Sequence, residues 1–191
     1  MEFEVNDDFL RNVVFDGDIV DSIPNFRARA SEEGDGSVIE NVDVQEQLMI
    51  DGIVEKCAHS RVWFAEEVLD IELADWQKKL LVALDEGETR ISIVSGNGPG
   101  KTMIVSVIGL HYLLFRNDVK VPITSPSSGQ LRDGLYPECI KWIKRLPDFL
   151  QNQLTYIKDR IYRTDDPENN FISFRTARKE TPEALAGIHA T

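Results

Sequence analysis

The chain has 191 residues, of which 42% are hydrophobic and 28% charged, and this balance is typical of a globular protein with a sizeable core and an additional arm. Its net charge of −12 argues against a large surface for non-specific nucleic-acid binding and leaves contact with DNA to a local patch. No signal-peptide pattern is recognisable, and the longest apolar run is too short for a membrane span. Cys57 and Cys139 fit no metal spacing, so we expect reduced thiols and a cytoplasmic protein without membrane partners.

The acidity is concentrated at the start of the chain. Residues 1–40 carry 11 acidic and 3 basic side chains, together with several glycines and one proline. We interpret them as an acidic, mobile N-terminal arm, with a short docking helix as the alternative. Residues 41–191 are then expected to form the folded domain.

Three helices are predicted before residue 90. Apolar residues recur at helical spacing over 41–58 and again over 60–70. Asp75 is the predicted N-cap of a third helix over 76–86. That helix ends in Asp85 and Glu86, and an apolar run closed by acids also marks the Mg²⁺-binding strand of ATPases. Its leucine and alanine content and the following Gly87 favour the helix.

After residue 90 the predicted strands and helices alternate. Strands are expected over 90–95, 119–123, 155–163 and 170–176. The helices between and after them are expected over 101–115, which is apolar nearly all round, over 128–145, kinked or divided by Pro137, and over 181–187. This alternation predicts an α/β layered fold with a mostly parallel sheet.

The stretch ISIVSGNGPGKT, residues 91–102, has the layout of a phosphate-binding loop between a strand and a helix. The predicted ligand-binding residues are Gly96, Asn97, Gly98, Pro99, Gly100, Lys101 and Thr102. Glycines let backbone N–H groups converge on an anion, and the helix dipole favours negative charge. Lys101 would neutralise the β- and γ-phosphates, and the Thr102 hydroxyl would bind Mg²⁺. Ser95 occupies the place of the usual first glycine, and a plain glycine-rich turn is the alternative.

Four stretches in order resemble the N-terminal ATPase domain of phage terminase large subunits. They are residues 61–84, the loop SGNGPGKT, residues 123–142 and residues 174–190. The resemblance implies a P-loop NTPase-type fold over 41–191 that binds ATP and Mg²⁺ and couples hydrolysis to viral DNA packaging. In the complete family protein it also implies a homo-oligomer in the host cytoplasm, with double-stranded DNA, a portal and a small terminase subunit as partners.

The resemblance also implies roles for single residues. Trp76 and Gln77 match an aromatic–glutamine pair that recognises adenine, and the alternative is a core tryptophan beside a solvated glutamine. Thr124, Ser125, Ser128 and Gln130 match a segment that contacts nucleic acid or couples nucleotide state to movement, and a loop with a helix cap explains them equally well. Arg175, Arg178 and Lys179 form a basic cluster suited to phosphates or to a solvated strand end.

Two departures from the family limit the expected activity. Asn97 stands where many terminases carry an arginine in the loop. The acidic-ended strand that supplies the catalytic carboxylates, and the nuclease domain, are not found before Thr191. We therefore expect an incomplete ATPase domain that retains Lys101 as its catalytic residue but turns over poorly. A helicase-like nucleic-acid-dependent ATPase and an inactive truncated remnant are the alternatives.

Overall fold

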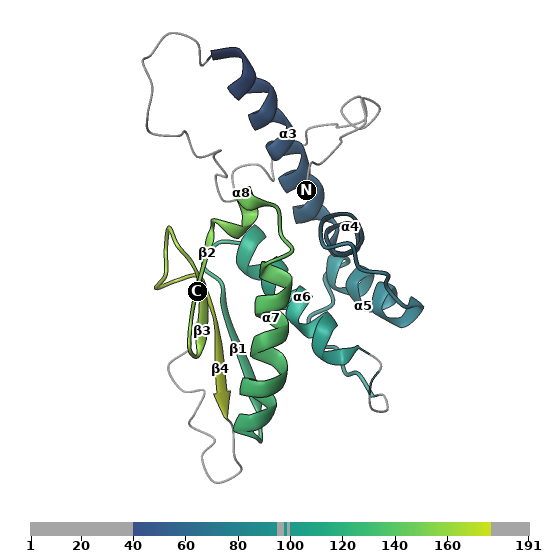
Figure 1. Ribbon diagram of the computed structural model, residues 1–191. Helices are drawn as coiled ribbons and strands as arrows, with labels where there is room; N and C mark the ends of the chain where they lie inside the picture. The colour runs from purple at the N-terminus through teal and green to yellow at the C-terminus, as the bar shows by residue number, and fades with distance from the viewer. Residues whose placement is uncertain (1–39, 95–97, 99, 177–191) are drawn as a thin grey trace.

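A computed structural model describes residues 40–94, 98 and 100–176 of the chain (Figure 1). Its helices are α3 (Glu40–His59), α4 (Arg61–Trp63), α5 (Asp75–Asp85), α6 (Lys101–Phe115), α7 (Tyr136–Ile143) and α8 (Asp148–Gln151). Two segments are π-helical. η1 (Phe64–Val68) directly follows α4, and η2 (Gln130–Leu135) directly precedes α7. The strands are β1 (Lys120–Ser125), β2 (Leu154–Ile157), β3 (Arg160–Arg163) and β4 (Phe171–Thr176). The predicted N-terminal arm up to residue 39 and the predicted helix over 181–187 lie outside the described residues.

The four strands form one mixed sheet in the order β1-β4-β3-β2. β1 and β4 are parallel, with Lys120 opposite Phe171 and Ser125 opposite Thr176. β4 pairs antiparallel with β3, and β3 pairs antiparallel with β2. The α/β class is therefore confirmed, whereas the prediction of a mostly parallel sheet is wrong for the described strands. The cause is the stretch 155–163, which turns at Lys158 and Asp159 into a hairpin instead of forming one strand.

The predicted strand over 90–95 is also wrong for the part that the structure describes. Residues 91–94 have the β-branched composition of a strand, but they join no ladder. Val94 is 95% exposed and Ile91 is 40% exposed, so their side chains bury little apolar surface. Composition favours a strand only where a neighbouring strand offers its N–H and C=O groups, and no described strand does so here.

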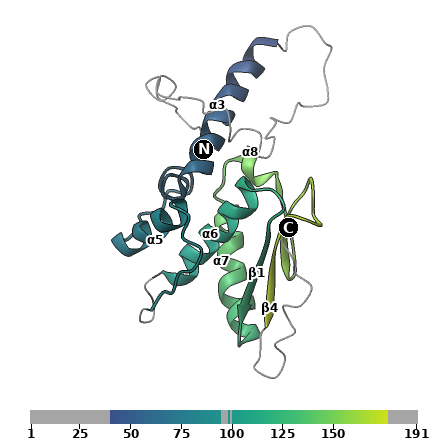
Figure 2. The ribbon, with the colours of Figure 1, turned by 180° about the vertical axis from the view of Figure 1, so that it is seen from behind.

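Helix α6 lies between the sheet on one side and α3, α4 and α5 on the other, with α7 beside it (Figures 1 and 2). Its buried residues include Ile104, Val107 and Leu110, all with no exposed surface. A Cβ on Gly109 would lie 3.4 Å from Cδ1 of Ile172 in β4, which is van der Waals distance, so the helix packs directly against the sheet at this point. The prediction of a buried helix over 101–115 is confirmed.

The remaining helical predictions hold with local corrections. The helix expected over 128–145 is continuous over 128–143. It changes from π-helical η2 to α7 between Leu135 and Tyr136, beside Pro137, and is not divided there. Pro122 lies in β1, which is an edge strand of the described sheet, where a missing N–H costs little. Helix α8 was not predicted. Cys57 and Cys139 are free, buried thiols, and burial raises the pKa of Cys139 to about 11.

Candidate nucleotide-binding site

The glycine-rich loop enters α6 through two residues with left-handed backbone conformation. Gly98 and Gly100 both have φ of +85°, a region that residues with a Cβ rarely adopt. Gly100, with ψ of 20°, is the N-cap of α6. The sequence prediction that glycine is needed at these positions therefore has a geometric basis. Gly96, Asn97 and Pro99, which we also predict to bind phosphate, lie outside the described residues.

Helix α6 presents its polar end to the surroundings and buries the rest. Lys101 is half-buried and Thr102 is exposed, and Thr102 is the one exposed residue among the 15 of this helix. The N–H of Ile104 donates to the carbonyl of Gly100 at 3.0 Å, which starts the helical ladder, so the N–H groups of Lys101, Thr102 and Met103 precede it. The Ser106 hydroxyl donates to the Thr102 carbonyl at 2.8 Å and ties down the first turn. An ammonium, a hydroxyl and converging N–H groups are the donors that bind a polyphosphate.

The donor set fits a magnesium ion that is held mainly by phosphate oxygens and water. Within the described residues no three His, Cys, Asp or Glu side chains gather closely enough to hold a metal. Magnesium commonly keeps several waters and takes only one or two protein ligands beside a nucleotide. The exposed Thr102 hydroxyl is the described group that suits this role.

Gln77 is brought against the glycine turn from a distant helix. It is the third residue of α5 and only 3% exposed. Its Oε1 accepts a hydrogen bond from the N–H of Ala74 at 2.9 Å, and its Nε2 lies 2.7 Å from the position that a Cβ on Gly100 would occupy. The prediction of Asp75 as N-cap is wrong, because Ala74 holds that position and Gln77 satisfies its N–H.

Trp76, the other residue of the predicted adenine pair, is half-buried and packs against the hydrophobic core. This position agrees with the alternative interpretation, in which Trp76 is a core tryptophan. Gln77, in contrast, is not the solvated residue of that alternative. The structure therefore brings Gln77 and Gly100 together, while a role in adenine recognition stays a prediction.

Asp85, the acid at the end of α5, forms an ion pair with a buried arginine. Arg61 is 2% exposed and forms an ion pair with Asp85 through Nη1, and its backbone N–H donates to Asp85 Oδ2 at 3.0 Å. Its guanidinium also lies over the Tyr112 ring, 4.6 Å from the centroid. The segment that ends at Asp85 is helical, which confirms the helix interpretation over a Mg²⁺-binding strand.

The segment after β1 forms a closed loop. The Ser125 hydroxyl donates to Gln130 Oε1 at 2.6 Å, and the N–H of Ser127 donates to Ser125 Oγ at 3.3 Å. Thr124 and Gln130 are exposed. These hydrogen bonds give Ser125 and Gln130 a structural role within the loop. They do not test whether the two residues also contact nucleic acid, which stays a prediction. Arg175 is half-buried in β4, and Arg178 and Lys179 lie outside the described residues.

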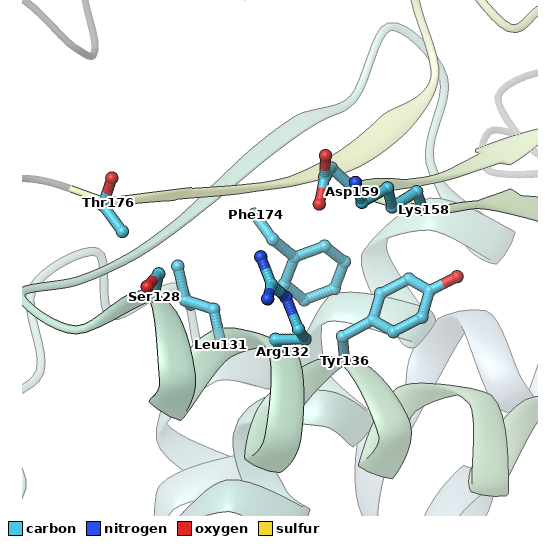
Figure 3. Close-up of a pocket in the computed structure, with 8 residues that line it drawn as sticks. All are labelled: Ser128, Leu131, Arg132, Tyr136, Lys158, Asp159, Phe174 and Thr176. Atoms are coloured by element: carbon cyan, nitrogen blue, oxygen red, sulfur yellow. The ribbon is translucent and has the colours of Figure 1, made fainter.

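A polar groove that the sequence did not predict opens beside this loop (Figure 3). It has a volume of about 190 Å³ and is lined by Ser128, Leu131, Arg132, Tyr136, Lys158, Asp159, Phe174 and Thr176. Arg132 rises from η2 toward Phe174, and Lys158 and Asp159 lie near the other rim. Only Ser128 had been singled out from sequence as a candidate functional residue, because the groove forms where η2, the start of α7, the hairpin turn and the end of β4 meet.

One wall of this groove is aromatic and firmly held. The Tyr136 and Phe174 rings meet edge to face with centroids 5.3 Å apart, and the Tyr136 hydroxyl donates to the Ile157 carbonyl at 2.8 Å. Burial raises the pKa of Tyr136 above the ordinary tyrosine value. The end of β4, which contributes to the groove, and the N-terminus of α6 lie toward the same, lower end of the molecule in both ribbon views (Figures 1 and 2).

Comparison with protein-family models and with curated proteins finds no match for this chain. Across residues 40–94, 98 and 100–176, none of the helices has both the length and the apolar character that crossing a membrane requires.

Proposed function

We propose that this chain is the nucleotide-binding part of a DNA-packaging motor of the terminase large-subunit type. The observation that carries the proposal is the turn at Gly98 and Gly100, which leads directly into the exposed end of a buried helix that begins with Lys101 and Thr102. The order of the four terminase-like stretches along the chain supports the motor class over other phosphate-binding proteins.

The chain's own groups would act on the polyphosphate by position and charge. The N–H groups at the start of α6 would donate to phosphate oxygens, and the helix dipole would favour their negative charge. Lys101 would lie beside the β- and γ-phosphates as a point charge. A magnesium ion bound with the nucleotide would neutralise charge that develops on the phosphates, and the Thr102 hydroxyl would hold it on the protein side.

Titration calorimetry with ATP and Mg²⁺ tests the proposal directly. We expect measurable binding by the wild-type chain and a loss of about tenfold or more in affinity for Lys101→Ala, because a charge-assisted contact to phosphate is removed. Lys79→Ala is the matched control, since Lys79 is an exposed lysine on α5. Equal affinity of the Lys101 variant and the wild type, or no binding by the wild type, would contradict the proposal.

A second pair of variants separates the metal from the phosphate contacts. Thr102→Val removes the hydroxyl from an exposed position and is expected to reduce the gain in ATP affinity that Mg²⁺ provides. Thr102→Ser keeps a hydroxyl and is expected to retain that gain. If the valine and serine variants respond to Mg²⁺ alike, Thr102 is not the magnesium ligand.

A further inference from the structure

The side chain of Gln77 bridges the start of α5 and the glycine turn before α6. Its oxygen accepts the N–H of Ala74 at 2.9 Å, which fixes the direction of the amide plane. Its nitrogen then faces Gly100, at 2.7 Å from the place of a Cβ, so the amide fills the space that any other residue at position 100 would need. Gln77 as a whole residue is only 3% exposed.

This arrangement suits support of the loop better than recognition of a base. An amide that reads adenine presents a donor and an acceptor together on an accessible edge. Here the acceptor is already bonded to Ala74 and the amide is buried.

We infer that Gln77 is a positioning residue that holds the Gly100 turn against α5 and thereby directs the first N–H groups of α6. This inference rests on the proposed function, because the groups it positions are those proposed to bind the polyphosphate. A turn that is held in place before binding loses less conformational freedom when the ligand arrives. Gln77 should therefore contribute to the affinity for every polyphosphate, whichever base is attached.

Calorimetry with three ligands separates positioning from base recognition. For Gln77→Ala we expect the affinities for ATP, GTP and inorganic tripolyphosphate to fall by a common factor, about five- to tenfold. A selective loss for ATP with unchanged GTP and tripolyphosphate binding would overturn the inference in favour of adenine recognition. Unchanged affinity for all three ligands would overturn it as well.

A second substitution separates the effect of Gln77 on the N-terminus of α5 from its effect on the Gly100 turn. Ala74 has extended backbone angles, φ −69° and ψ 155°, which suit a serine N-cap. In the Gln77→Ala background, Ala74→Ser should restore the cap of α5 and raise the melting temperature. It should leave the loss in tripolyphosphate affinity unchanged. Full recovery of affinity by the serine would show that Gln77 acts only on α5, contrary to the inference.

A double-mutant cycle tests the contact without any nucleotide. Gly100→Ala is expected to destabilise the chain through its positive φ and through collision with the Gln77 amide. Gln77→Ala removes the collision, so the double variant should be more stable than the sum of the two single effects predicts. If the two substitutions have additive effects on the free energy of unfolding, Gln77 and Gly100 do not interact, and the inference is overturned. Coupling in a chain that binds no nucleotide would instead refute the proposed function and leave the contact standing.

Discussion

Replacement of Asp85 by alanine is expected to destabilise the fold strongly, because Asp85 is the ion-pair partner of a buried arginine. Asp85 is the partner of the Arg61 guanidinium, and the side chains are 17% and 3% exposed, respectively. The same carboxylate accepts the backbone N–H of Arg61 at 3.0 Å. Removing it leaves a positive charge and an N–H group in the protein interior without this partner, which costs about 3–5 kcal/mol for a buried pair. A single domain is commonly stable by only about 5–15 kcal/mol, so the loss is large.

Urea unfolding followed by tryptophan fluorescence measures this cost. The matched control is Glu86→Ala, the next residue and an exposed acid, which should change the free energy of unfolding by no more than about 0.5 kcal/mol. The double variant Arg61→Leu with Asp85→Leu should cost clearly less than Asp85→Ala, because no charge is left buried. It should still lose about 1 kcal/mol, because the backbone N–H at position 61 loses its carboxylate acceptor. The reasoning is refuted if Asp85→Ala costs as little as Glu86→Ala.

Two further predictions concern α6 and α3. Burial lowers the pKa of His111 from 6.5 to about 3, so between these values the unfolded chain binds the extra proton and the free energy of unfolding falls as the pH drops. The slope is about 1.4 kcal/mol per pH unit. Above pH 6.5 the histidine is neutral in both the folded and the unfolded chain, so it no longer lowers the free energy of unfolding. Unfolding at pH 7 and pH 5 measures it, and His111→Gln should remove this part of the slope. Gly52→Ala should raise the free energy of unfolding by about 0.5–1 kcal/mol, because Gly52 lies within α3 and a Cβ there meets no atom within 4 Å. A lower melting temperature would contradict this.

The helices were predictable because their signals are local. Apolar spacing over 41–58 and the continuous apolar run over 101–115 give α3 and α6 with bounds within a residue or two. The sheet was less predictable because pairing joins residues far apart in sequence. Residues 91–94 have strand composition but no described neighbour, and Lys158 with Asp159 makes a turn that alternation alone does not reveal.

The candidate site likewise has features that the sequence predicts and features that depend on tertiary packing. The positive φ of Gly98 and Gly100 follows from the glycine pattern itself, as does the placement of Lys101 and Thr102 at the start of a helix. The approach of Gln77 to Gly100 depends on how α5 packs, which the sequence does not state. The groove needs η2, the hairpin turn and the end of β4 to meet, so tertiary structure was required to find it.

The exposure pattern of α6 bears on the choice between a phosphate site and a plain connecting turn. A connecting turn would be expected to lead from a strand in the sheet into a helix, yet residues 91–94 join no described strand. The layout of a phosphate loop is incomplete for the same reason, so the strand favours neither interpretation. Of the 15 residues of the helix, 14 are buried or half-buried and Thr102 alone is exposed. Polar residues at an exposed helix end fit either interpretation, so the effect of Lys101→Ala on ATP affinity decides between a phosphate site and a plain connecting turn.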